Sequence, residues 1–195
     1  VRPGRSTANA ARAIDGSMTW ISACGAPDLS SLEQPLVSNF MLNATFLGHS
    51  ISDTPRIRAW SHVFIVCVDK AVRNYCEGRQ KLIDYVGSSN KTSRLIAGLG
   101  DFETCINSTK RCLRLMDRLA ADRENPGVER TPRRLLNSFD DEITGMRDAI
   151  EHMDERIAET SGEGGEPQLL FVATDGMTLI IGASRIEFER LAICL

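Results

Sequence analysis

The sequence is poor in cysteine and histidine, and it has no long apolar run. Its six cysteines among 195 residues fall well below the ~8–10% of a disulfide-stabilised scaffold. No two of them form a Cys-x-x-Cys pair, and only three histidines are present, so we expect reduced thiols, no metal site and no cofactor. The chain lacks the ~20 consecutive apolar residues of a membrane span, and residues 1–29 lack the ~7–15-residue apolar stretch of a signal peptide. These absences predict a cytoplasmic protein that does not cross a membrane.

An overall excess of basic residues is absent as well. The chain has 23 Lys and Arg against 26 Asp and Glu, a net charge of −3, which excludes a highly basic nucleic-acid coat protein. The charge is distributed unevenly, because residues 56–123 hold 13 basic and 7 acidic side chains, whereas residues 131–166 hold 4 basic and 10 acidic ones. With 42% hydrophobic and 25% charged residues, the composition is typical of an ordinary globular protein.

Periodic apolar residues and capping signals predict four long helices. We expect them over residues 31–49, 54–86, 101–122 and 131–160. The first begins at a capping box, Ser31-x-x-Gln34. The second begins at Thr54-Pro55, a capping hydroxyl followed by a proline at the first helical position. The glycine- and serine-rich residues 87–100 predict a loop.

The C-terminal residues predict a small β element. Two short apolar runs, Leu169–Ala173 and Thr178–Ile181, flank Asp175-Gly176, which is a strong hairpin signal. Ser184-x-x-Glu187 has the pattern of a capping box that starts a short terminal helix. We therefore expect three regions: a loosely ordered segment over 1–29, with at most one short element near Met18–Ala23; a helical bundle over 30–161; and a linker, hairpin and terminal helix over 162–195 that pack on the bundle.

The last predicted helix has an apolar stripe on one side and a histidine on the other. Its apolar residues alternate steps of three and four: Leu136, Phe139, Ile143, Met146, Ile150, Met153 and Ile157. At 100° per residue, His152 points away from that stripe. Gly145 lies on the same side as His152 and would let another backbone approach closely. We expect a second copy of this helix there, because two-fold dimers dominate soluble oligomers.

The residues Arg147-Asp148-Ala149-Ile150-Glu151-His152 place an arginine, a polar residue and then a histidine five positions after the arginine. This pattern on a late helix resembles the signature of the HEPN (higher eukaryotes and prokaryotes nucleotide-binding) superfamily, including uncharacterised bacterial members. The resemblance implies a four-helix bundle of the HEPN type. The side of the last helix opposite its apolar stripe predicts a homodimer whose interface includes Gly145, Asp148, His152 and Glu155.

The same resemblance implies a metal-independent endoribonuclease that acts as a toxin or defence effector, with RNA as substrate and an antitoxin protein as a candidate partner. The ribose 2′-hydroxyl would attack the adjacent phosphate, and His152 would act as general acid or base. Arg147 would pair with the scissile phosphate, and Asp148 would orient the histidine or the arginine by hydrogen bonding. Asp148 departs from the asparagine that many members carry after the arginine.

The basic side chains of the third predicted helix are the candidate substrate-binding groups. Arg111, Arg114 and Arg118 lie opposite its apolar side and could contact RNA phosphates. The simpler interpretation is that this stripe, together with Lys110, is the solvent face of an amphipathic helix. The motif also has a simpler interpretation, a solvated face on which Arg147 pairs with Glu151, and His152 with Glu155 or Arg156. Two other functions remain open: a non-catalytic module that dimerises or docks on a partner, and nucleotide binding without cleavage.

Overall fold

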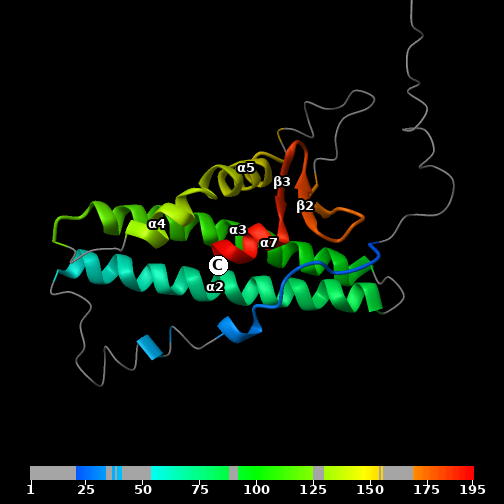
Figure 1. Ribbon diagram of the computed structural model, residues 1–195, viewed down its shortest axis with the longest axis horizontal. Coiled ribbons are helices and arrows are strands. Elements are labelled where there is room, and N and C mark those ends of the chain that lie inside the picture. Colours follow the sequence, from blue (N-terminus) through cyan, green and yellow to red (C-terminus); the bar gives the residue numbers. More distant parts are fainter. Residues whose placement is uncertain are drawn as a thin grey trace, which may run out of the picture.

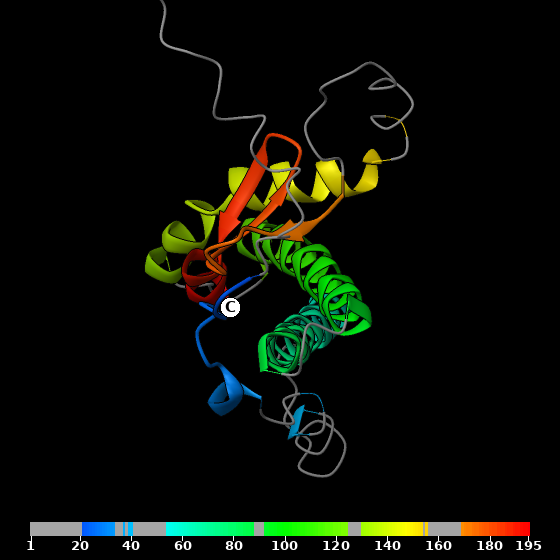
Figure 2. The ribbon, with the colours of Figure 1, turned by 90° about the vertical axis from the view of Figure 1, so that its right-hand side faces the viewer.

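The computed structural model describes residues 21–33, 37, 39–40, 54–87, 92–124, 130–153, 155 and 169–195. Two long antiparallel helices, α2 (Pro55–Gly87) and α3 (Thr92–Ala121), form its main layer (Figure 1). Two shorter helices follow, α4 (Arg130–Asn137) and α5 (Asp140–Glu151), and α5 packs on α3. A three-stranded antiparallel sheet lies beside α5, and a terminal helix, α7 (Phe188–Cys194), follows it (Figure 2). The mainly helical fold with a small C-terminal β element is confirmed, but a four-helix bundle is not.

Helix α2 begins where the sequence predicts, because Pro55 is its first residue and the amide of Arg58 donates to the carbonyl of Thr54 at 3.1 Å. The Thr54 hydroxyl donates to Oε2 of Glu124 at 3.0 Å. The buried face of α2 recurs at helical spacing: Ile57, Cys67, Ala71, Tyr75, Leu82 and Tyr85.

Helix α3 begins at Thr92, so the prediction of a loop over residues 87–100 is wrong for residues 92–100. The glycines there serve a packing role. Gly98 is buried against Gly78 of α2, where a Cβ atom on Gly98 would lie 3.2 Å from the Gly78 carbonyl oxygen. The two helices can approach this closely only because neither residue has a side chain.

The last predicted helix is divided in two at Ser138 and Phe139. The amides of both residues donate to carbonyls three positions earlier, and the Ser138 hydroxyl donates to the carbonyl of Leu135 at 2.6 Å. A side chain that competes for helix carbonyls in this way favours a break. Three acidic residues then occupy the first turn of α5, where the helix dipole favours negative charge. The apolar stripe persists across the break, because Phe139, Ile143, Met146 and Ile150 are all buried; Ile157 lies outside the described residues.

The sheet contains one strand more than expected. Strand β1 (Phe171–Val172) pairs with β2 (Thr178–Ile181), which confirms the hairpin around Gly176, a residue with φ of +74°. The predicted capping box at Ser184 and Glu187 is wrong, since residues Ser184–Glu187 form β3, which pairs with β2. Gly182, at φ of +54°, makes the tight turn that brings β3 back, and α7 starts only at Phe188.

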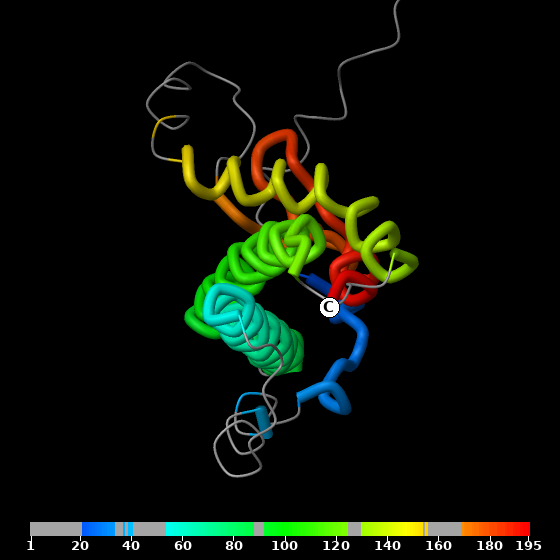
Figure 3. The backbone as a smooth tube through the Cα atoms, turned by 90° about the vertical axis from the view of Figure 1, so that its left-hand side faces the viewer, coloured from blue at the N-terminus to red at the C-terminus, as the bar shows by residue number. Residues whose placement is uncertain are grey.

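The core joins the helix pair, the sheet and α7. The rings of Tyr75, Phe102 and Phe188 form an edge-to-face and a tilted contact, with centroids 5.9 and 4.9 Å apart. Residues 21–29 contain no helix or strand, yet Ile21 and Ala26 are buried in the same cluster. Figure 3 shows this segment as a blue tube that passes α7. Residues 1–20 and most of the helix predicted over 31–49 lie outside the described residues, as does the linker before Pro167; Ser31 itself lies in a 3-10 turn, Ser30–Leu32 (η1).

Candidate functional site

Helices α3 and α5 enclose a pocket of about 370 Å³ whose lining is strongly basic. We call it the basic pocket. Its lining residues come from both helices: Asn107, Lys110, Arg111, Arg114, Leu115, Arg118, Arg147 and Glu151. Among these described residues there are five cationic side chains and one carboxylate. The structure thus brings the three predicted phosphate-binding arginines and the predicted catalytic arginine to one place, although they lie far apart in the sequence.

The α3 wall of the basic pocket is a regular stripe. Asn107, Arg111, Arg114 and Arg118 follow one another at steps of four, three and four residues, which places them along one side of the helix. The three arginines are exposed, whereas Leu115 is buried. Side chains on such a stripe can reach successive charges along an extended anion.

Arg147 forms the opposite wall together with Glu151, one turn further along α5. Its guanidinium pairs with the Glu151 carboxylate through Nη2, and its Nη1 lies 3.4 Å from Oδ1 of Asp148. The Arg147 side chain is 21% exposed, so it is held in the wall rather than extended into solvent. Of the two partners predicted for Asp148, the structure places the arginine within hydrogen-bond distance.

Lys110 differs from its arginine neighbours because it is buried, with 7% of its surface exposed. Its Nζ donates to Oδ1 of Asp140 and to the hydroxyl of Thr144, both at 2.6 Å. The interpretation of Lys110 as part of a solvent face is therefore wrong. A lysine is rarely buried without a partner, and here its two partners on α5 fix the spacing of the two helices that form the basic pocket.

His152 lies at the C-terminal end of α5 rather than in the middle of a long helix. Its backbone amide donates to the carbonyl of Asp148 at 3.1 Å. The side chain is 55% exposed, and Nδ1 is 2.9 Å from Oε2 of Glu155. If Nδ1 carries the proton in this pair, Nε2 holds the lone pair that a general base needs. His152 is not among the lining residues of the basic pocket.

Gly145 faces the sheet of its own chain. The Ser184 hydroxyl donates to the Gly145 carbonyl at 3.1 Å, and a Cβ atom on Gly145 would lie 3.7 Å from that hydroxyl oxygen. The close approach that this glycine permits is thus used by β3. Asp148 on α5, and His152 and Glu155 after its end, keep side-chain exposures of 47%, 55% and 75%, so these three side chains are accessible in the single chain. The homodimer remains a prediction.

Sequence analysis missed one residue of this site. Asn107 lines the basic pocket, and its Oδ1 atom is buried without a hydrogen-bond partner in the described part of the chain. Most buried polar atoms in proteins have such a partner, which makes this one notable. The signal that could have found Asn107 is its place on the same helical stripe as the three arginines.

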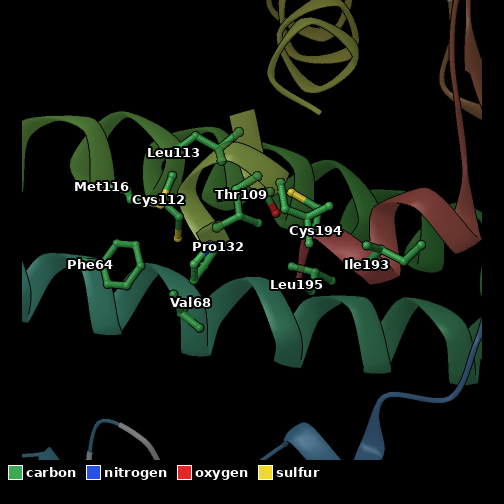
Figure 4. Close-up of a pocket in the computed structure, with 12 residues that line it drawn as sticks. Phe64, Val68, Thr109, Cys112, Leu113, Met116, Pro132, Ile193, Cys194 and Leu195 are labelled. Atoms are coloured by element: carbon green, nitrogen blue, oxygen red, sulfur yellow. The ribbon is translucent and has the colours of Figure 1, made fainter. Parts of the chain in front are cut away.

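A second hollow, of about 340 Å³, lies between α2, α3, α4 and α7 and is lined mainly by apolar side chains (Figure 4). Burial raises the pKa of its two thiols, Cys112 and Cys194, the latter to about 11, so both are neutral at pH 7 and therefore weak nucleophiles. The Thr109 hydroxyl is already bonded to the carbonyl of Cys105 at 2.9 Å. This apolar hollow therefore offers no group suited to binding a phosphate.

Within the described residues, no three His, Cys, Asp or Glu side chains are grouped so that they could hold a metal ion. No helix in that part of the chain is both long enough and apolar enough to cross a membrane.

Comparisons with known proteins add no relative: no family model matches the chain, and neither a curated protein nor a solved structure matches it. The motif on α5 and the geometry of the basic pocket are therefore the features that bear on function.

Proposed function

We propose that this protein is a metal-independent endoribonuclease that binds the RNA backbone in the basic pocket and cleaves it near His152. The observation that carries the proposal is the position of Arg147, which shares one pocket with Arg111, Arg114 and Arg118. The resemblance of residues 147–152 to the HEPN signature provides the reaction type. The ribose 2′-hydroxyl attacks the adjacent phosphate, so no metal ion or water nucleophile is required.

The charge of the basic pocket supports a polyanionic ligand. Lys110 is neutralised by Asp140, and one of the four arginines is paired with Glu151. Three arginine side chains of α3 remain exposed toward solvent. Planar guanidinium groups suit phosphate oxygens because they can donate two parallel hydrogen bonds. Successive phosphates along one RNA strand can therefore follow the stripe of α3.

Arg147 is the residue that we assign to the scissile phosphate. It is held in place from two sides, by Glu151 and by Asp148, so its guanidinium is oriented before the substrate arrives. A pre-oriented cation stabilises the negative charge that develops on the phosphate oxygens in the transition state. Asp148 in this scheme orients the arginine.

His152 is assigned the proton transfers. With Nδ1 directed at Glu155, Nε2 accepts the proton of the 2′-hydroxyl, or in its protonated form gives one to the leaving 5′-oxygen. We propose that two chains pair through the exposed side of Asp148, His152 and Glu155, which would place both histidines and both basic pockets around one RNA strand.

A cleavage assay tests the proposal. Purified protein is incubated with labelled single-stranded RNA in the presence of EDTA, and His152→Ala is expected to lower the cleavage rate by about 10²–10⁴-fold. The matched control is His62→Ala, because His62 lies on α2, where its ring packs against Phe40 at a centroid distance of 5.8 Å. Equal rates for the wild type and His152→Ala would reject the catalytic assignment.

The proposed role as a toxin or defence effector has its own test. Induced expression of the wild type in bacterial cells should arrest growth, and the Arg147→Ala and His152→Ala variants should not. If all three proteins are tolerated equally, the cellular role is rejected even where cleavage is observed in vitro.

A further inference from the structure

Asn107 stands at one end of the arginine stripe, and the groups around it determine what it can bind. Every other charged or polar side chain of α3 that lines the basic pocket is a pure donor, since it ends in an ammonium or a guanidinium group. The carboxylate of Glu151 is already paired with Arg147. Among the described residues, Asn107 Oδ1 is a buried acceptor at the wall of this pocket that has no hydrogen-bond donor.

A phosphate cannot satisfy this oxygen, because the phosphate of a nucleic acid is itself an acceptor. The ligand must therefore bring a hydrogen-bond donor close to an anionic group. In a nucleic-acid backbone, the 2′-hydroxyl of ribose is the donor that lies beside every phosphate, and deoxyribose lacks it. We propose that Asn107 makes the basic pocket selective for RNA over DNA, by accepting a hydrogen bond from a ribose 2′-hydroxyl. This inference rests on the proposed binding of RNA in the same pocket.

The proposed contact requires a rotation of the Asn107 side-chain amide. The Asn107 side chain lines the pocket, and its oxygen is the atom turned away from solvent. Rotation about the bond between Cβ and Cγ exchanges the positions of oxygen and nitrogen, and this torsion is soft in asparagine. In the orientation that the structure shows, the oxygen has no hydrogen-bond partner among the described residues, so a ribose hydroxyl that enters the pocket favours the orientation in which the oxygen faces the ligand.

The experiment compares three oligonucleotides of one sequence: RNA, DNA and 2′-fluoro RNA. The fluorinated strand keeps the ribose-like pucker and size but has no donor at the 2′ position. Fluorescence anisotropy is measured in the His152→Ala background, so that RNA is not consumed. RNA is expected to bind with a dissociation constant about two- to tenfold lower than both other strands, which is the range expected of one neutral hydrogen bond.

Three further variants distinguish recognition of the ribose 2′-hydroxyl by Asn107 from a general contribution to nucleic-acid binding. Asn107→Leu should abolish the preference, so that RNA, DNA and 2′-fluoro RNA bind with equal dissociation constants. Asn107→Asp keeps an acceptor but adds a negative charge, so it should weaken all three strands and preserve the ratio between them. Arg114→Ala should also weaken all strands equally, because a phosphate contact does not read the sugar. The ratio of dissociation constants is insensitive to partial misfolding, which would lower binding of every strand.

Two results would overturn the inference: equal binding of RNA and 2′-fluoro RNA, or an undiminished preference for RNA in Asn107→Leu. Its failure is distinct from failure of the proposed function. A chain that cleaves RNA while Asn107→Leu keeps the preference would refute the role of Asn107 alone. A chain that never cleaves RNA but selects it through Asn107 would refute the catalysis alone.

Discussion

Gly78 of α2 and Gly98 of α3 face each other across the contact of the two long helices. A Cβ atom on Gly78 would lie 3.1 Å from the carbonyl oxygen of Gly98, and the reverse distance is 3.2 Å. Both glycines are buried, and the same interface includes an ion pair between Lys81 and Asp101. At this contact no side chain separates the two backbones, and a Cβ atom on either glycine would be crowded by the other helix.

Substituting Gly98 should therefore destabilise the fold, although alanine is the better helix former. A methyl group in this contact forces the helices apart, and overpacking of this kind costs about 1–3 kcal/mol. We expect Gly98→Ala to lower the free energy of unfolding by about 1–2 kcal/mol, measured by urea denaturation. The control is Gly100→Ala in the same helix, where a Cβ atom meets nothing within 4 Å and where stability should rise by up to ~1 kcal/mol. Gains at both positions would show that the close approach is absent.

Lys110 provides a second test of stability. Lys110→Met keeps the aliphatic stem but removes the donor from Asp140 and Thr144. A hydrogen bond to a charged group contributes about 1.5–3 kcal/mol. Asp140 keeps 41% of its side chain exposed and so recovers part of this in water. We expect a loss of about 1–2 kcal/mol in urea denaturation, against less than ~0.5 kcal/mol for the exposed neighbour in Arg114→Met. Equal losses would mean that Lys110 does not hold α3 to α5.

The arginines of α3 should determine how strongly RNA binding depends on salt. Each phosphate contact with a single strand contributes about 0.7 to the slope of log affinity against log salt concentration. Arg114→Ala should therefore lower RNA affinity and reduce this slope by about 0.7. The matched control is Arg94→Ala, an exposed arginine of the same helix that is not among the lining residues of the basic pocket. A change of slope in Arg94→Ala as large as that in Arg114→Ala would place the RNA elsewhere.

The buried thiols predict that stability falls at alkaline pH. Desolvation raises the pKa of Cys105 to about 12 and that of Cys194 to about 11, from an ordinary value of 9.0. Above pH 9 the unfolded chain releases thiol protons that the folded chain retains, so the free energy of unfolding decreases as pH rises. The urea midpoint should fall between pH 9 and pH 11. In Cys105→Ala the fall should be shallower, even though this variant is less stable at pH 7; a midpoint that is constant or rises over this range would contradict the assignment.

Much of the fold could be predicted from local signals. Thr54-Pro55 marks the start of α2, and Asp175-Gly176 marks the hairpin, because each depends on backbone chemistry within a few residues. The apolar stripe of residues 136–153 also identifies the core side correctly. The division between α4 and α5 was not predicted, because the apolar period of three and four residues continues past Ser138, whose hydroxyl bonds the carbonyl of Leu135.

Two predictions from the sequence, for Gly98 and for Lys110, were wrong because the contacts that decide them form only in the tertiary structure. In the sequence Gly98 looks like a loop residue, because Gly78, the glycine it packs against, lies 20 positions away. Lys110 has the character of a surface residue until Asp140 and Thr144 are brought alongside. The candidate site could likewise be predicted only in part. The motif on α5 and the arginines of α3 were both visible in the sequence, but the pocket that joins Arg147 to them depends on the packing of α5 against α3.

The pairing of Arg147 with Glu151 has a consequence for selectivity among anions. In the resting protein the guanidinium is paired with a carboxylate of the same helix, so a ligand anion competes with a partner that cannot diffuse away. A small anion such as acetate or orthophosphate must compete with the Glu151 carboxylate for Arg147 and can contact few of the other arginines at the same time. An RNA strand that is bound at several points along α3 keeps its phosphate beside Arg147 although Glu151 occupies one edge of the guanidinium, so this pairing favours polymeric anions over small ones.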